Sequence, residues 1–116
     1  MLTIYHNPRC SKSRQTLALI EENNQDVTIV EYLKTPLHID AIKNLAKLLN
    51  VSPREMMRVK EAEYKEQNLA TADDAALFLA MASTPKLIER PIVTNEKNAI
   101  IGRPPENVLS LFATKS

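Results

Sequence analysis

The stretch that decides the fold reads Tyr5-His6-Asn7-Pro8-Arg9-Cys10-Ser11-Lys12-Ser13-Arg14. Before it, apolar and polar residues alternate as on a β-strand, and Asn7-Pro8 breaks that alternation. After it, Leu17 and Ile20 follow at helical spacing. The sequence therefore predicts a strand, a turn and a helix in succession, with Cys10 at the N-terminus of the helix.

The position of Cys10 favours a reactive thiol. A thiolate at a helix N-terminus faces unpaired backbone N–H groups and the positive end of the helix dipole, and Arg9, Lys12 and Arg14 add positive charge nearby. Thiols in such places reach pKa values of roughly 3.5–7.5, against about 8.5 for a free cysteine. A lone cysteine is more commonly a small, buried and inert side chain, but the basic and polar neighbours argue against burial here. We therefore predict that Cys10 is a nucleophile.

Three neighbours of Cys10 could support its thiolate, and each also has a plainer interpretation. His6 would lower the pKa of the thiol further if it were protonated, or it merely covers the end of the first strand. Asn7 and Ser13 could hydrogen-bond the thiolate. Equally, Asn7 could be a turn former and Ser13 an ordinary residue of the first helical turn. The sequence leaves these alternatives open.

The composition limits the classes of function. The 116 residues fit a single domain, residues 1–116, and the single cysteine excludes an intramolecular disulfide. A net charge of +1, from 15 basic and 14 acidic residues, gives no strong field toward nucleic acid or a membrane. Gly102 is the only glycine, which excludes glycine-rich phosphate loops, and the lone cysteine and two histidines lack the spacing of metal ligands. With no secretory signal and no long apolar run, we expect a soluble, cytoplasmic protein without a bound metal.

The middle of the chain predicts a second strand and a helical insertion. Val27–Tyr32 is rich in β-branched residues, as a buried strand would be, and should pair parallel to the first strand. One helix should lie between Thr35-Pro36 and Asn50. A second, short helix is opened by the capping box Ser52-Pro53-Arg54-Glu55 and carries Met56, Met57 and Arg58, and a third runs over about 71–84. These helices form an insertion at about 37–84.

Two short apolar runs near the C-terminus predict a β-hairpin. Pro91–Thr94 and Asn98–Ile101 flank the polar turn Asn95–Lys97. A last helix follows Gly102–Glu106, and its apolar side comprises Val108, Leu109, Leu111 and Phe112. The order β-α-β, helical insertion, β-β-α predicts an α/β fold with a mixed four-stranded sheet.

This order and five short motifs resemble a known family. A cysteine between the first strand and the first helix, with a proline entering the third strand, resembles the thioredoxin fold. The motifs resemble those of the glutaredoxin-coupled arsenate reductase (ArsC) family and extend over almost the whole chain: Tyr5-His6-Asn7-Pro8-x-Cys10-x-x-Ser13-Arg14, Tyr32-Leu33-x-Thr35-Pro36, Leu69-Ala70, Arg90-Pro91-Ile92-Val93 and Arg103-Pro104. The end of the chain at Ser116 resembles the shorter, arsenate-reductase-related branch of that family.

The resemblance implies roles for particular residues. It implies that Cys10 is the nucleophile, that the peptide bond before Pro91 is cis, and that three arginines bind the oxyanion, namely Arg58, Arg90 and Arg103. Arginine suits a tetrahedral oxyanion because its planar fork offers paired N–H donors to two oxygens. From the residues alone, the alternative is that these arginines are surface charges paired with nearby acids, which are Glu55, Glu89 and Glu106.

The resemblance also implies an activity and partners. The activity is that of an oxidoreductase that reduces arsenate or a related oxyanion, with no bound cofactor, glutathione as co-substrate and glutaredoxin as the regenerating protein. Two alternatives are an Spx-like redox transcription regulator and a glutathione-dependent thiol transferase. Regulators of the first kind typically carry Cys-x-x-Cys, and Ser13 at the second position weighs against that class.

Overall fold

The computed structural model describes residues 2–95 and 97–111. The chain divides into two compact units, one formed by Met1–Thr35 with Arg90–Ser116 and the other by Pro36–Glu89. We call them the sheet unit and the helical unit and describe each by itself. Whether the whole chain behaves as a single domain stays a prediction.

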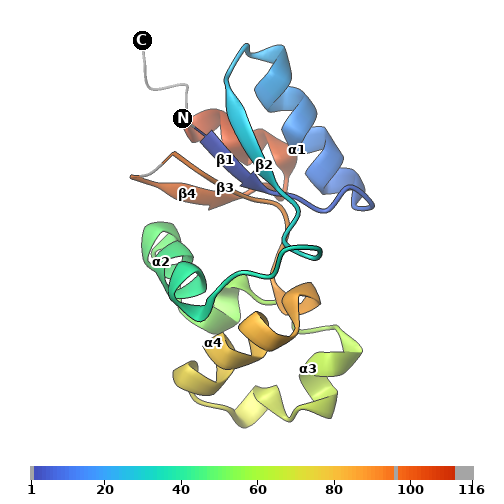
Figure 1. The fold of residues 1–116 in the computed structure, drawn as a ribbon, viewed down its shortest axis with the longest axis vertical. Coiled ribbons are helices and arrows are strands. Elements are labelled where there is room, and N and C mark those ends of the chain that lie inside the picture. The colour runs from blue at the N-terminus through green and yellow to red at the C-terminus, as the bar shows by residue number, and fades with distance from the viewer. Residues whose placement is uncertain (1, 96, 112–116) are drawn as a thin grey trace. The chain divides into compact units, whose positions relative to one another are not determined.

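The sheet unit contains a mixed four-stranded sheet (Figure 1). Its strands are β1 (Leu2–Tyr5), β2 (Val27–Val30), β3 (Ile92–Thr94) and β4 (Ala99–Ile101), in the spatial order β2-β1-β3-β4. The first two strands are parallel, with Ile4 opposite Ile29, whereas β3 is antiparallel to both β1 and β4. The predicted α/β class with a mixed sheet is therefore confirmed.

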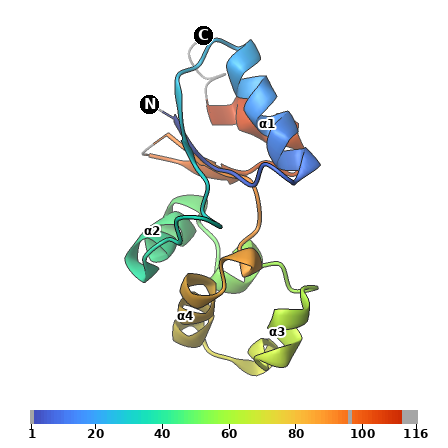
Figure 2. The same cartoon turned by 45° about the vertical axis from the view of Figure 1, so that its right-hand side comes forward.

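One face of this sheet packs against two helices that lie side by side (Figure 2). They are α1 (Ser11–Glu22) and the 3₁₀ helix η4 (Pro105–Leu111). Their buried side chains and those of the sheet form one core, which comprises Leu2, Ile4, Ile20, Val93, Val108 and Leu111. Fully burying a side chain such as Ile20 contributes roughly 1.5–3 kcal/mol, so this core fixes α1, and with it Cys10, against the end of β1.

The prediction that the second strand is buried was wrong. Strand β2 lies at the edge of the sheet and ends at Val30, and both Thr28 and Ile29 are exposed. The β-branched residues of this segment reflect the preference of such side chains for extended backbone, which edge and central strands share.

The helical unit contains α2 (Ile39–Leu49), α3 (Ala62–Glu66) and α4 (Asp74–Ser83). Short 3₁₀ helices connect them, namely η1 (Pro53–Met56), η2 (Leu69–Thr71) and η3 (Pro85–Leu87). Helix α2 ends where Asn50 adopts the left-handed conformation, and α4 begins where the Asp73 carboxylate accepts a hydrogen bond of 2.9 Å from the Ala76 N–H. Both helices were predicted.

The second, short helix predicted for the insertion differs from the observed one. The capping box is present, since the Ser52 N–H donates to Glu55 Oε1 at 2.9 Å, but it opens only one 3₁₀ turn, and Met57 and Arg58 lie beyond that turn. The sequence analysis missed α3, because five residues are too few to show a helical period. The last predicted helix is the 3₁₀ helix η4, and Phe112, like Glu96 of the hairpin turn, lies outside the described residues. Among the described helices, none has the length and apolar character needed to cross a bilayer.

Candidate active site

The turn between β1 and α1 holds Cys10 at the N-terminus of α1. Cys10 has extended backbone angles (φ −94°, ψ 123°), and its carbonyl accepts the hydrogen bond of 3.0 Å that Arg14 N–H donates. The Cys10 N–H donates to the Asn7 carbonyl at 3.0 Å, and the Arg14 guanidinium donates to the Pro8 carbonyl at 2.9 Å. These hydrogen bonds hold the backbone of the turn in one conformation, so the Cys10 thiol is attached to a fixed backbone.

A buried polar cluster supports this turn from behind. Ser13 is fully buried, and its hydroxyl lies 2.6 Å from His6 Nδ1 and accepts a hydrogen bond of 3.1 Å from the Asn7 N–H. The Asn7 side-chain oxygen in turn accepts from the Arg9 N–H at 3.0 Å. The side chains of His6, Asn7 and Ser13 therefore bond within the turn, and the structure thus favours a positioning role for all three.

The surroundings of Cys10 lower the pKa of its thiol. Partial burial alone would raise this pKa, but the backbone N–H groups of Ser13 and Lys12 and the guanidinium of Arg90 favour the thiolate and outweigh burial. These donors favour the ionised form of the thiol, which is the form that reacts.

His6 is a neutral partner in this arrangement. Its burial lowers its pKa, which outweighs the opposing effect of the Glu31 carboxylate, and the Arg14 guanidinium adds to the lowering. Of the two interpretations of His6, the structure favours the one in which the ring covers the end of β1 and bonds to Ser13. The positively charged form of the His6 imidazole is therefore disfavoured.

Arg90 and Arg103 occupy two neighbouring loops of the sheet unit. The Arg103 guanidinium donates to the Arg90 carbonyl at 3.2 Å, and the peptide bonds that follow both residues, before Pro91 and Pro104, are cis. The Nε atom of Arg90 is buried and has no hydrogen-bond partner among the described residues. The structure thus brings together Cys10, Arg90 and, through the Arg90 peptide, Arg103.

Arg58 belongs to the helical unit, where it forms an ion pair. Its Nε donates to Glu61 at 2.9 Å, and its backbone N–H donates to the Leu87 carbonyl at 2.7 Å. The acidic partner is thus Glu61 and not Glu55, the neighbour suggested by the sequence. Within the described part of the chain, neither Arg90 nor Arg103 forms an ion pair with an acidic residue, although Arg103 is exposed as a surface charge would be. The role of Arg58 toward an oxyanion stays a prediction.

Two residues of this region were missed by the sequence analysis. Thr16 of α1 is fully buried and its hydroxyl donates to the Lys12 carbonyl at 2.8 Å. Gly102 lies against Thr16, and its N–H donates to the Pro91 carbonyl at 2.9 Å. No local pattern marks this contact, because Thr16 and Gly102 are far apart in the sequence, although a lone glycine in a chain is itself a signal of close approach.

Comparisons with known proteins agree with this fold. The family model described as the ArsC family matches residues 5–111. An uncharacterized protein YfgD of Escherichia coli is 52% identical over 93% of each chain, and an arsenate reductase of Haemophilus influenzae is 47% identical over 94% of this chain and 97% of its own. A solved structure of an arsenate reductase from Vibrio cholerae superposes with a TM-score of 0.93 at 49% identity, covering 96% of this chain and 97% of that one.

The chain therefore belongs to the ArsC family. The thioredoxin-like α/β fold and the family that the motifs indicated are both confirmed.

Proposed function

We propose that this protein is an arsenate reductase in which Cys10 attacks the oxyanion and glutathione and glutaredoxin supply the electrons. The observation that carries the proposal is the Cys10 thiol with its lowered pKa, adjoining two helix N–H groups and the Arg90 guanidinium. The relatives from Haemophilus influenzae and Vibrio cholerae, which carry the name arsenate reductase, agree with it.

Arg90 and Arg103 would hold the oxyanion. A buried N–H without an acceptor costs about 1–3 kcal/mol, and the Nε atom of Arg90 is such a group. An arsenate oxygen is a strong acceptor and would remove that cost, while the second guanidinium balances the remaining negative charge. The family resemblance implies an oxyanion-binding role for Arg58 as well.

The electrons move in two exchanges between sulfur and its partners. The Cys10 thiolate displaces one arsenate oxygen, which leaves as water, and forms a sulfur–arsenic(V) bond. A glutathione thiolate then attacks the Cys10 sulfur, so that a disulfide bond forms and the sulfur–arsenic bond breaks. The electron pair of the broken bond stays on arsenic, which departs as arsenite, arsenic(III).

Regeneration requires thiols from outside the chain, because Cys10 is the only cysteine. A glutaredoxin thiol attacks the glutathione sulfur of the mixed disulfide and releases the Cys10 thiolate, and a further glutathione reduces glutaredoxin. Each arsenate thus oxidises two glutathione molecules to one disulfide. The cycle needs a reducing, glutathione-containing compartment such as the cytoplasm.

The test is arsenate reduction with glutathione and glutaredoxin, followed through arsenite formation, for the wild type and Cys10→Ser. The serine variant should fold normally and show no turnover above a mixture without protein, because its hydroxyl stays protonated at neutral pH. Wild-type protein incubated with arsenate and glutathione alone should carry one glutathione on Cys10 by intact mass. Turnover by the serine variant, or an oxidised wild type without the adduct, would contradict the cycle.

A further inference from the structure

The proposed cycle leaves one structural question. It is where glutathione binds when its thiol attacks the Cys10 sulfur, and we call this thiol the resolving thiol. The attacking sulfur must arrive beside Cys10, and the chain contributes no second cysteine. A small peptide thiol has too little surface to be held by shape alone, so charged groups near the β1–α1 turn should select it. The binding site inferred for this thiol rests on the proposed function, because that function requires a thiol from outside the chain.

A hollow of about 270 Å³ lies against that turn, entirely within the sheet unit. One wall is the turn itself, from His6 to Arg9, which immediately precedes Cys10. The other wall is the segment after β2, with Glu31, Leu33 and Lys34. Consecutive Cα atoms are about 3.8 Å apart and an extended tripeptide spans roughly 10 Å, so the reach of such a ligand exceeds the separation of the Arg9 and Cys10 backbones.

The walls of this hollow carry two cations, one carboxylate and one apolar side chain. The Arg9 guanidinium forms no ion pair within the described residues, so it is available to an anion. The Lys34 ammonium lies 3.3 Å from the Glu31 carboxylate, and both side chains are accessible to solvent. Leu33 is 43% exposed and adds an apolar surface to the hollow.

We propose that this hollow binds the glutathione that resolves Cys10. Glutathione has two carboxylates, one ammonium and two short methylene stretches, which match in kind the two cations, the carboxylate and the leucine side chain of the hollow. Arg9 and Lys34 bind the carboxylates, and Glu31 exchanges its contact with Lys34 for one with the ligand ammonium.

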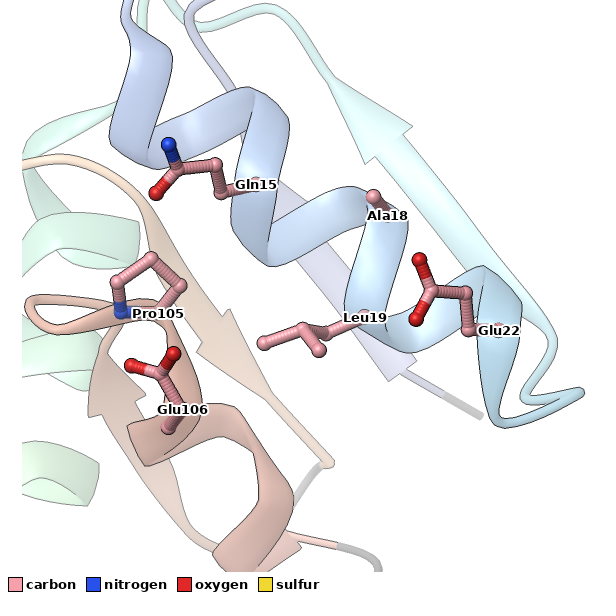
Figure 3. Close-up of a pocket in the computed structure, with 6 residues that line it drawn as sticks. All are labelled: Gln15, Ala18, Leu19, Glu22, Pro105 and Glu106. Atoms are coloured by element: carbon pink, nitrogen blue, oxygen red, sulfur yellow. The ribbon is translucent and has the colours of Figure 1, made fainter.

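A second hollow, of about 260 Å³, is the other candidate for the glutathione site, and its charge distinguishes it from the first. It lies between α1 and η4, and the carboxylates of Glu22 and Glu106 line it together with Gln15 (Figure 3). None of its described lining residues is a lysine or an arginine. Two uncompensated carboxylates repel a ligand of net negative charge, so this site is unsuited to glutathione.

The test compares two disulfides as reagents for Cys10, without arsenate. Oxidised glutathione and the neutral bis(2-hydroxyethyl) disulfide are each reacted with the wild type and with the double variant Arg9→Ala/Lys34→Ala. The double variant should lose roughly three- to thirty-fold in rate with oxidised glutathione, as expected for two exposed ion pairs. The rate of the double variant with the neutral disulfide reports any change in the reactivity of the Cys10 thiol itself. The rate with oxidised glutathione is therefore divided by this rate.

Lys97→Ala is the matched control, because it removes an exposed positive charge of the sheet unit outside the hollow. It should leave the preference for oxidised glutathione unchanged. In an NMR titration with S-methylglutathione, the amide signals of Arg9, Leu33 and Lys34 should shift together. The loss in rate should also shrink at high salt, since the contacts are exposed.

Several results would overturn the subsite. Equal normalised rates for the wild type and the double variant would do so, as would S-methylglutathione shifts confined to the hollow of Gln15 and Glu22. Because none of these measurements uses arsenate, they are independent of the proposed activity. If the double variant loses its preference for oxidised glutathione but the wild type does not reduce arsenate, the subsite stands and the arsenate reductase proposal is refuted. If the wild type reduces arsenate but the double variant keeps that preference, the subsite is refuted and the arsenate reductase proposal stands.

Discussion

Gly102→Ala should disturb the active site from a distance. A Cβ added at Gly102 would lie 2.5 Å from Thr16 Oγ1 and 2.9 Å from Pro91 Cγ, both closer than side-chain atoms normally approach. Thr16 is fixed in α1 and Pro91 follows Arg90, so neither neighbour is the far end of a flexible chain. The hairpin end must therefore move away from α1, and the Arg90 guanidinium moves with it.

The expected loss of stability follows from these contacts. Overpacking a tight site costs typically about 1–3 kcal/mol, and the lower entropy of alanine in the unfolded chain returns about 0.4–1 kcal/mol, because the backbone at Gly102 is not in the left-handed region. The net destabilisation is about 1–2 kcal/mol. For a chain of this size it corresponds to a fall in Tm of roughly 4–8 °C.

Two measurements and two companion variants test this reasoning. Thermal unfolding gives the stability, and the pH profile of Cys10 alkylation gives the pKa of the thiol, which should rise toward its ordinary value as Arg90 withdraws. Thr16→Ala removes the nearest atom and should rescue part of both effects in the double variant. Thr16→Ser keeps the oxygen at 2.5 Å and is the matched control, which should rescue little.

The reasoning fails if Gly102→Ala is as stable as the wild type with an unchanged alkylation profile. It also fails if the alanine and serine replacements of Thr16 rescue equally, because the clash with the hydroxyl oxygen would then not be the cause.

Two further predictions concern single side chains of the site. Arg90→Lys keeps the positive charge and loses the paired N–H donors of the guanidinium, so kcat/KM for arsenate reduction should fall by about one to two orders of magnitude. The control Lys97→Ala should stay at the wild-type value. A wild-type rate for Arg90→Lys would show that the paired donors are dispensable. His6 binds a proton less readily in the folded protein than in the unfolded chain, so as pH falls below 6.5 the unfolded chain takes up the proton first and stability is lost. His6→Gln should therefore lose less stability toward acid than His38→Gln in urea unfolding at a series of pH values, and parallel curves would remove His6 as the cause.

The features that the sequence predicted correctly are those with local causes. Asn50 and Asp73 mark helix ends through their own backbone conformation and side-chain bonding, so the bounds of α2 and α4 followed from nearby residues. The place of Cys10 at the start of α1 followed in the same way from Asn7-Pro8 and the helical spacing after it.

The features that the sequence did not predict depend on partners distant in the chain. The edge position of β2 is set by which strands pair, and no residue of Val27–Val30 encodes it alone. The contact of Gly102 with Thr16 joins β4 to α1, and the pairing of Arg58 with Glu61 depends on the turn that follows η1. The arginines of the site became candidates through the family resemblance, because nothing in their immediate neighbours distinguishes them from surface charges.

The dependence on an external thiol that we propose is consistent with the packing of the turn as well as with the cysteine count. Ser13 stands where a second cysteine of a Cys-x-x-Cys motif would stand, and it is fully buried. Its hydroxyl bonds both to His6 at 2.6 Å and to the Asn7 N–H at 3.1 Å, distances that suit oxygen and are too short for the larger sulfur atom. The hydroxyl bonds to His6 Nδ1, and burial lowers the pKa of that imidazole, whereas Arg90 and the helix N–H groups favour the Cys10 thiolate. The turn thus places a serine oxygen where a second cysteine would stand and leaves Cys10 as its one sulfur, as the proposed single-thiol cycle requires.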